Sequence, residues 1–160
     1  GILILLKLHI ILFQPEIMGN VGAVMRTCVA IGATLHLIEP LGFHWDQRVV
    51  ERTSVHLVRQ LDYHIYPDFD QFQKINHHPF LIAVETVGTV CYARFNFVNY
   101  TEIFLVFGRE STGIPSSLLK QMPISLRIPM QPRVSSINLA TSVAVIGFEV
   151  CRQYDYQRFV

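Results

Sequence analysis

Four short runs of this sequence carry polar side chains or glycines at spacings that suit ligand binding or catalysis. They are Asn20-x-Gly22-x-x-x-Arg26, Glu85-Thr86-x-Gly88, Gly108-x-Glu110-x-x-Gly113-x-Pro115, and Ile128-Pro129-Met130 with Ser136-Ile137-Asn138-Leu139. Asparagine and glutamate can orient a reacting group, and arginine can hold a phosphate or a carboxylate. No Ser or Cys stands beside a plausible His base, so covalent hydrolysis has no candidate machinery. Each run alone has an ordinary structural explanation, and only their joint occurrence points to a site.

Apolar runs precede these polar segments and predict the strands that position them. We expect strands at 1–13, 34–38, 61–66, 80–84, 103–107 and 125–128. Helices are expected from Asn20 to Gly32, over 46–52, from Asp68 to Lys74, from Pro115 to about Gln121, and from Ser136–Asn138 onward. Strands that alternate with helices indicate an α/β fold with a mostly parallel sheet flanked by helices.

The carboxyl ends of parallel strands meet at one edge of the sheet, where open α/β folds bind ligands. The last strand is the most informative, because a loop stiffened by Pro129 and Pro132 leads from it into the N-terminus of a helix. Free backbone N–H groups and the helix dipole favour a ligand there, although an ordinary connection is the simpler explanation of this stretch alone.

Composition narrows the class of protein. The 160 residues suit one domain, 51% are hydrophobic and 16% charged, and the net charge of +1 neither favours nor excludes RNA. Three widely spaced cysteines fit reduced thiols in a cytosolic protein and give no zinc motif. The apolar start is too short to span a bilayer, so we expect a cytoplasmic protein without membrane partners. Dinucleotide, phosphate-loop and nucleophile-elbow motifs are absent from the sequence.

Together, in this order, the motifs resemble the SPOUT-superfamily RNA 2′-O-ribose methyltransferases of the SpoU type. Within that group the sequence is most similar to the small bacterial tRNA (cytidine/uridine wobble 2′-O)-methyltransferase family, from about His9 to Tyr156. The resemblance rests on the runs 20–28, 35–43 and 107–115, and on 128–130 with 136–139.

The resemblance implies one methyltransferase domain over residues 1–160, with a C-terminal trefoil knot and a homodimer built across it. It also implies S-adenosylmethionine (SAM) as cofactor and no metal. By position, the cofactor pocket would comprise Val84, Thr86, Gly108, Ile128, Met130, Ser136, Ile137 and Leu139. Aliphatic walls suit the flat adenine ring, and glycine at 108 would let the backbone approach the ligand closely.

The implied reaction transfers a methyl group from SAM to a tRNA ribose 2′-hydroxyl at the wobble nucleotide, leaving S-adenosylhomocysteine. Arg26 occupies the position that similar enzymes place at the reacting hydroxyl. Because the pKa of arginine exceeds about 12, we expect Arg26 to clamp the target phosphate, with that phosphate or a shielded guanidinium taking the proton. Asn20 and Glu110 would orient Arg26 and its surrounding loop, and Asn138 would hold the knotted loop.

RNA contacts are expected from both subunits, through Arg26, Arg48, Arg52, Arg133, Arg152 and Tyr156. The chain departs from the family where the loop usually reads Arg-Ser-Leu/Met-Asn-Leu-Ser-Asn, because Ser135 replaces the arginine and Arg133 precedes it by two residues. This departure leaves an alternative: a knotted SAM- and RNA-binding dimer that acts on another RNA, such as rRNA, or is catalytically inactive. Base methylation is a third hypothesis, and the Arg26 motif argues against it.

Overall fold

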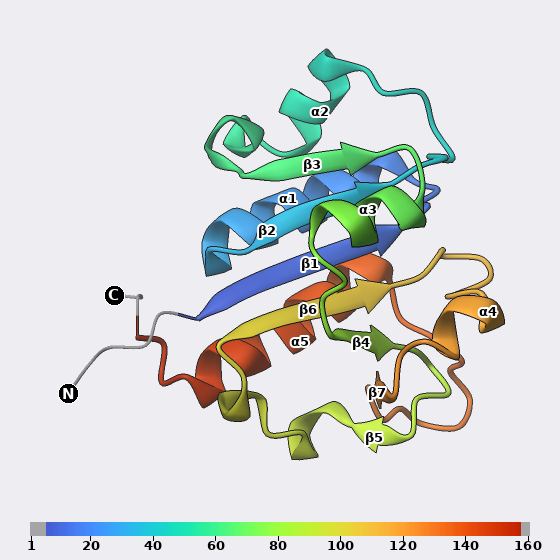
Figure 1. The fold of residues 1–160 in the computed structure, drawn as a ribbon. Coiled ribbons are helices and arrows are strands. Elements are labelled where there is room, and N and C mark those ends of the chain that lie inside the picture. The colour runs from blue at the N-terminus through green and yellow to red at the C-terminus, as the bar shows by residue number, and fades with distance from the viewer. Residues whose placement is uncertain (1–5, 158–160) are drawn as a thin grey trace.

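A parallel β-sheet forms the centre of the molecule. The computed structural model describes residues 6–157, and in this part of the chain seven strands pair in the order β3-β2-β1-β6-β4-β7-β5 (Figure 1). Every pairing between neighbouring strands is parallel. The strands are β1 (Lys7–Phe13), β2 (Thr34–Ile38), β3 (Tyr63–Tyr66), β4 (Leu81–Val84), β5 (Val90–Cys91), β6 (Glu102–Phe107) and β7 (Ile124–Arg127).

Helices cover both faces of this sheet. Figure 1 shows α1 (Met18–Ile31) and α5 (Leu139–Gln153) behind the sheet, with α3 (Phe69–Ile75) and α4 (Ser116–Leu119) in front of it. The remaining α-helix, α2 (Gln47–Thr53), lies beyond the edge strand β3, and short 3₁₀ turns occupy Leu57–Gln60, Tyr92–Arg94 and Phe97–Asn99. The described residues contain no helix long and apolar enough to cross a membrane.

Successive side chains of each strand point to opposite faces of the sheet, so the core has two layers. In β1, Leu8, Ile10 and Leu12 join the cluster beneath α1 and α5, whereas Ile11 and Phe13 join the cluster beneath α3 and α4. Successive side chains of a strand point to opposite faces, so a strand covered on both sides must be apolar throughout. The continuous apolar run in the sequence is therefore explained by helices on both faces of the sheet.

The predicted α/β fold with a parallel sheet is confirmed, and most predicted elements lie within two residues of their observed bounds. Gly32 ends α1 in the left-handed conformation with φ of 72°, and Asp46 and Asp68 cap α2 and α3 through their side chains. The first strand begins at Lys7, and the part of its prediction over residues 1–5 lies outside the described residues. The sequence analysis missed β5 and the 3₁₀ turns, which are too short to show periodicity.

Two helix boundaries were predicted wrongly. The helix α1 begins at Met18 with Ile17 at the N-cap position, not at Asn20, and Ile17 makes no side-chain cap. Its backbone N–H instead donates to the Glu110 carboxylate, 2.9 Å away, so a residue distant in sequence replaces the local cap. Pro115 occupies the N-cap position of α4, which ends at Leu119 rather than Gln121.

Candidate functional site

A cavity of about 570 Å³ opens where β4, β6 and β7 end. The loops that follow these strands, the N-terminus of α1 and the start of α5 form its wall. Residues lining it are Ile17, Asn20, Val84, Glu85, Thr86, Phe107, Gly108, Arg109, Glu110, Ser111, Thr112, Gly113, Ile128, Met130, Ser135, Ser136, Ile137, Asn138, Leu139 and Ser142. Its size and mixture of aliphatic and polar side chains match those of small-molecule sites.

The eight residues predicted to hold a cofactor all line this cavity, although they come from segments far apart in sequence. They are Val84, Thr86, Gly108, Ile128, Met130, Ser136, Ile137 and Leu139. The parallel arrangement explains their meeting, since β4 pairs with both β6 and β7 and all three end at the same edge.

Glycine at position 108 is required by the protein's own backbone. A Cβ atom on Gly108 would lie 2.2 Å from the carbonyl carbon of Gly113 and 2.3 Å from the nitrogen of Ile114. The loop folds back here, as Arg109 and Gly113 exchange backbone hydrogen bonds of 3.2 and 2.9 Å. The predicted reason for this glycine was close approach to a ligand, whereas the structure shows close approach within the loop.

Three of the four predicted catalytic residues form one chain of hydrogen bonds. Asn138 Nδ2 donates to Asn20 Oδ1 at 2.9 Å, and Asn20 Nδ2 donates to Glu110 at 3.3 Å. Glu110 also accepts the backbone N–H groups of Glu16 and Ile17, at 3.1 and 2.9 Å. The amide of Asn20 must point its nitrogen at the carboxylate, because a carboxylate can only accept. These bonds tie the start of α1 to the loop after β6 and to the start of α5.

Asn138 also forms a capping hydrogen bond at the start of α5. Its Oδ1 accepts the backbone N–H of Thr141 at 3.2 Å, which is the capping interaction expected of asparagine at a helix N-terminus. The predicted helix start at Ser136–Asn138 is therefore confirmed. One side chain both caps α5 and holds Asn20.

Arg26, the fourth predicted catalytic residue, takes no part in these hydrogen bonds. It is exposed on α1, it does not line the cavity, and within residues 6–157 it has no hydrogen bond or ion pair. Six residues separate it from Asn20, and six steps of 100° place two side chains on different faces of a helix. Asn20 is already occupied by Glu110 and Asn138, so it does not orient Arg26 of the same subunit.

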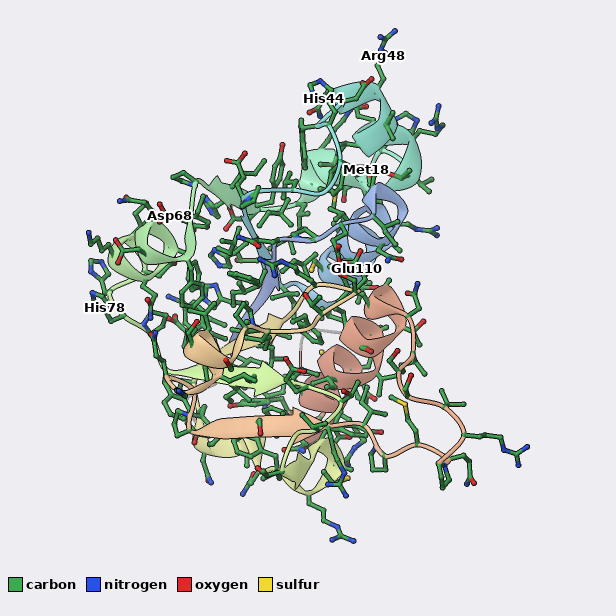
Figure 2. The ribbon with its side chains drawn as sticks, turned by 90° about the vertical axis from the view of Figure 1, so that its right-hand side faces the viewer. Met18, His44, Arg48, Asp68, His78 and Glu110 are labelled. Atoms are coloured by element: carbon green, nitrogen blue, oxygen red, sulfur yellow. The ribbon has the colours of Figure 1, made fainter. Side chains whose placement is uncertain are left out.

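The other predicted RNA contacts are spread over the molecule. Arg48 and Arg52 are exposed on α2, and Figure 2 shows Arg48 projecting outward, apart from Glu110. Arg133 is exposed in the loop before α5. Arg152 and the exposed Tyr156 lie near the other end of α5, about 20 Å from its start at 1.5 Å per residue. Arg152 bonds to Glu149 at 2.7 Å.

Sequence reasoning assigned no role to two glutamates whose side chains bind these loops, although Glu85 belongs to one of the four runs singled out above. Glu16 accepts the backbone N–H and the hydroxyl of Ser111, both at 2.8 Å, and these bonds hold the pKa of its carboxyl below the ordinary value. Glu85 accepts the backbone N–H of Ile114 at 2.6 Å, and burial raises the pKa of its carboxyl against the opposing effect of backbone hydrogen bonds. Both glutamates follow the end of a predicted strand, and this position is the feature of the sequence from which they could have been identified.

Arg109 is the one cationic side chain among the residues that line the cavity in the described part of the chain. Its guanidinium donates to Gln14 Oε1 and lies 5.2 Å from the centroid of the Phe13 ring. Residues 6–157 contain no group of three or more His, Cys, Asp or Glu side chains placed to hold a metal ion.

A sequence model of the SpoU rRNA methylase family matches residues 7–148. The chain belongs to the SpoU rRNA methylase family. The resemblance stated from the motifs is thus confirmed, and the site described above is that of a SpoU-family protein.

Two relatives are similar to this chain over almost their whole length. The tRNA (cytidine(34)-2′-O)-methyltransferase of Aeromonas hydrophila is 39% identical over 157 residues, covering 93% of this chain and 96% of the relative. The enzyme of the same name from Escherichia coli K12 is 36% identical over 158 residues, covering 93% and 95%.

Solved structures share this fold, as two examples show. One, described as giving insight into the 2-OH methylation of C/U34 on tRNA, is 34% identical with a TM-score of 0.87, covering 94% of this chain and 97% of that one. The SpoU methyltransferase AviRb of Streptomyces viridochromogenes, solved with AdoMet, has a TM-score of 0.83 at 22% identity, covering 92% and 57%. At that identity the likeness extends to the fold alone.

Proposed function

We propose that the protein transfers a methyl group from SAM to the ribose 2′-hydroxyl of a tRNA nucleotide, the wobble cytidine or uridine at position 34. The observation that carries this proposal is the chain Asn138–Asn20–Glu110 at the wall of the 570 Å³ cavity. It occurs in a chain that is 36–39% identical, nearly end to end, to relatives named for this reaction.

The cavity fits SAM in size and in the chemistry of its walls. Its volume of about 570 Å³ lies within the usual range of ligand pockets, about 300–1,000 Å³. Val84, Ile128 and Leu139 offer aliphatic surface to an adenine ring, and the polar residues along 108–113 and 135–138 offer hydrogen bonds to the rest. When bound, SAM supplies a methyl group that its positive sulfur has already activated.

The protein must then align the ribose hydroxyl and help it lose a proton. A guanidinium remains charged at neutral pH, since its pKa exceeds about 12, so Arg26 suits the role of holding the target phosphate. That phosphate takes the proton, or Arg26 takes it in its neutral guanidine form once bound RNA shields the side chain from water. Asn20, Glu110 and Asn138 keep the walls of the cavity in one geometry, which is a positioning role.

The position of Arg26 supports a homodimer. Since Arg26 does not line the cavity of its own subunit, a second copy that presents its Arg26 to this cavity would complete the site. In that arrangement Arg48, Arg52 and Arg133 could reach RNA from either subunit, whereas Arg152 and Tyr156 would contact a more distant part of it.

We also propose that the C-terminal part of the chain forms a trefoil knot. The chain is tightly packed where such a knot would close, because a Cβ atom on Gly88 would lie 2.5 Å from the carbonyl carbon of Leu126. We assign residues 1–160 to one methyltransferase domain that needs no metal. We place the protein in the cytoplasm, where thiols such as those of Cys28 and Cys151 stay reduced.

Methyl transfer from labelled SAM into unmodified tRNA, followed by mapping of the label, tests the reaction directly. We expect label in a 2′-O-methyl nucleoside at position 34. Arg26→Ala should lower the turnover at least about a hundredfold, the usual scale for a residue that positions or helps deprotonate the reacting group. Full activity of Arg26→Ala would overturn the mechanism.

One observation favours a second candidate function. Ser135 stands in the cavity wall where the family's loop has an arginine, so a contact to RNA or cofactor is missing. A SAM-binding dimer without tRNA activity would bind SAM in calorimetry but label no tRNA. Label in rRNA fragments alone would instead make rRNA the substrate.

A further inference from the structure

Glu85 lies directly after β4 and is one of the residues that line the cavity. One oxygen accepts the backbone N–H of Ile114 at 2.6 Å. Both oxygens face Gly113, since a Cβ atom placed there would be 3.1 Å from each of them. The carboxylate is thus fixed against the loop that follows β6.

This carboxylate has no countercharge. Within residues 6–157 Glu85 forms no ion pair, and Arg109, the cation of the cavity wall, is engaged with Gln14 and Phe13 instead. The other carboxylate of the wall, Glu110, already accepts two backbone N–H groups and the Asn20 amide. Partial burial of a carboxylate without a countercharge is unfavourable, and it raises the pKa of Glu85 although the backbone N–H groups of Ile114 and Thr86 oppose this effect. A bound cation would reverse both effects.

We propose that Glu85 binds the α-ammonium group of the methionine part of SAM and of S-adenosylhomocysteine, an inference that rests on the proposed function. The ammonium is the only group of SAM that is both positively charged and a hydrogen-bond donor, because the sulfonium carries no hydrogen. A charge-assisted N–H···O bond between them is stronger than a bond between neutral groups. The aminocarboxypropyl chain of SAM would therefore lie beside Gly113, and Glu85 would help discriminate complete cofactor from fragments that lack this chain.

Binding calorimetry with two ligands separates this role from support of the loop. S-adenosylhomocysteine carries the ammonium, whereas 5′-methylthioadenosine retains adenine, ribose and thioether but lacks the amino-acid part. Glu85→Gln keeps an oxygen that can accept from Ile114, whereas it removes the charge and replaces the second oxygen by an NH₂ group. Asp70→Asn on α3 is the matched control, because it also removes one negative charge but lies outside the cavity wall.

We expect Glu85→Gln to weaken S-adenosylhomocysteine binding about tenfold to a hundredfold, the scale of one hydrogen bond to a charged group. Its affinity for 5′-methylthioadenosine should stay within about twofold of the unsubstituted protein, and Asp70→Asn should change neither.

Two results would overturn the assignment while leaving the proposed function intact. In the first, Glu85→Gln weakens both ligands equally, which would place the carboxylate at the ribose or make it a support of the loop alone. In the second, Glu85→Gln binds S-adenosylhomocysteine as tightly as the unsubstituted protein does. Failure of the unsubstituted protein to bind SAM or S-adenosylhomocysteine would overturn both proposals together.

Discussion

Acidification should destabilise this protein through one buried histidine, His36 in β2, which is only 2% exposed. Burial is the main cause that lowers the pKa of His36 from 6.5 to about 3, and the neighbouring His9 and His64 add to the effect. The folded protein therefore binds fewer protons than the unfolded chain between about pH 3 and pH 6.5. Stability must fall as pH decreases through this window.

The side chains that bind His36 offer no negative charge to a second proton. Asn76 Nδ2 donates to Tyr66 Oη at 3.2 Å, Tyr66 Oη lies 2.9 Å from His36 Nδ1, and His36 Nε2 lies 2.9 Å from His9 Nδ1. Tyr66 has one hydroxyl hydrogen and two lone pairs, so it can accept from Asn76 and donate to Nδ1 of a neutral His36 at the same time. A second proton on His36 would bury a positive charge beside Tyr66 and His9, neither of which carries a negative charge. At the far end, His9 Nε2 points toward the Glu102 carboxylate at 3.8 Å.

The size of the loss in stability can be calculated from the pKa shift of His36. At 1.36 kcal/mol per pKa unit, a change from 6.5 to about 3 amounts to about 5 kcal/mol once both states are titrated. Between about pH 7 and pH 5, the loss in free energy of unfolding from His36 alone should be about 2 kcal/mol. The pKa of His9 is lowered too, again chiefly by burial, and adds to the loss.

Urea unfolding at several pH values, followed by the fluorescence of Trp45, measures this loss. Trp45 is the only tryptophan of the chain. Protein concentration must stay fixed, because association would shift the apparent stability. His36→Gln retains hydrogen-bonding groups and removes the titration, so its stability should fall about 2 kcal/mol less than that of the unsubstituted protein over the same interval. Equal losses in the two proteins would refute the reasoning.

Two further predictions concern the cavity wall. Asn138→Ala should lower the free energy of unfolding by about 1 kcal/mol through loss of the helix cap, whereas Asn138→Asp can still accept from Thr141 and should keep most of that stability. Both variants lose the donor to Asn20 and should lose methyl transfer in the tRNA assay; activity in Asn138→Asp, which keeps the cap, would contradict the role given to this donor. Gly108→Ala places a Cβ 2.2 Å from a backbone carbon and should abolish S-adenosylhomocysteine binding in calorimetry. Gly19→Ala, which meets no heavy atom within 4 Å, should bind normally and be more stable by about 0.5–1 kcal/mol; normal binding by both variants would contradict this account of the loop.

The sequence predicted those parts of the fold that depend on short-range patterns. Apolar runs marked the central strands, and Gly32 and Asn138 marked helix ends because their conformational and capping preferences are local. The start of α1 could not be found in this way. Its N-terminal N–H groups are satisfied by Glu110, which is 93 residues away from Ile17 in sequence.

The same distinction applies to the site. The cofactor residues were assigned from the family resemblance. The parallel sheet explains why they meet, because β4, β6 and β7 bring their carboxyl ends to one edge. The helical period alone would have predicted that Arg26 and Asn20 lie on different faces of α1. The family resemblance had instead led us to expect that Asn20 orients Arg26. Glu85 was visible as a polar residue after a strand, yet its lack of a countercharge depends on where Arg109 and Glu110 find their own partners.

The hydrogen-bond chain connects the two halves of the proposed site through α1. Glu110, in the cavity wall, fixes the first turn of α1 by accepting from Glu16 and Ile17, and Asn20 ties that turn to Asn138 at the start of α5. Arg26 is carried by the same helix, six residues further on. A rigid helix transmits the placement of its first turn to every later residue, so the geometry of the cavity wall also sets the direction in which Arg26 points. In the proposed dimer that direction is toward the second subunit. Loss of any bond in this chain should therefore impair methyl transfer more than it impairs cofactor binding, because binding needs one cavity whereas transfer needs the cavity and the arginine in register.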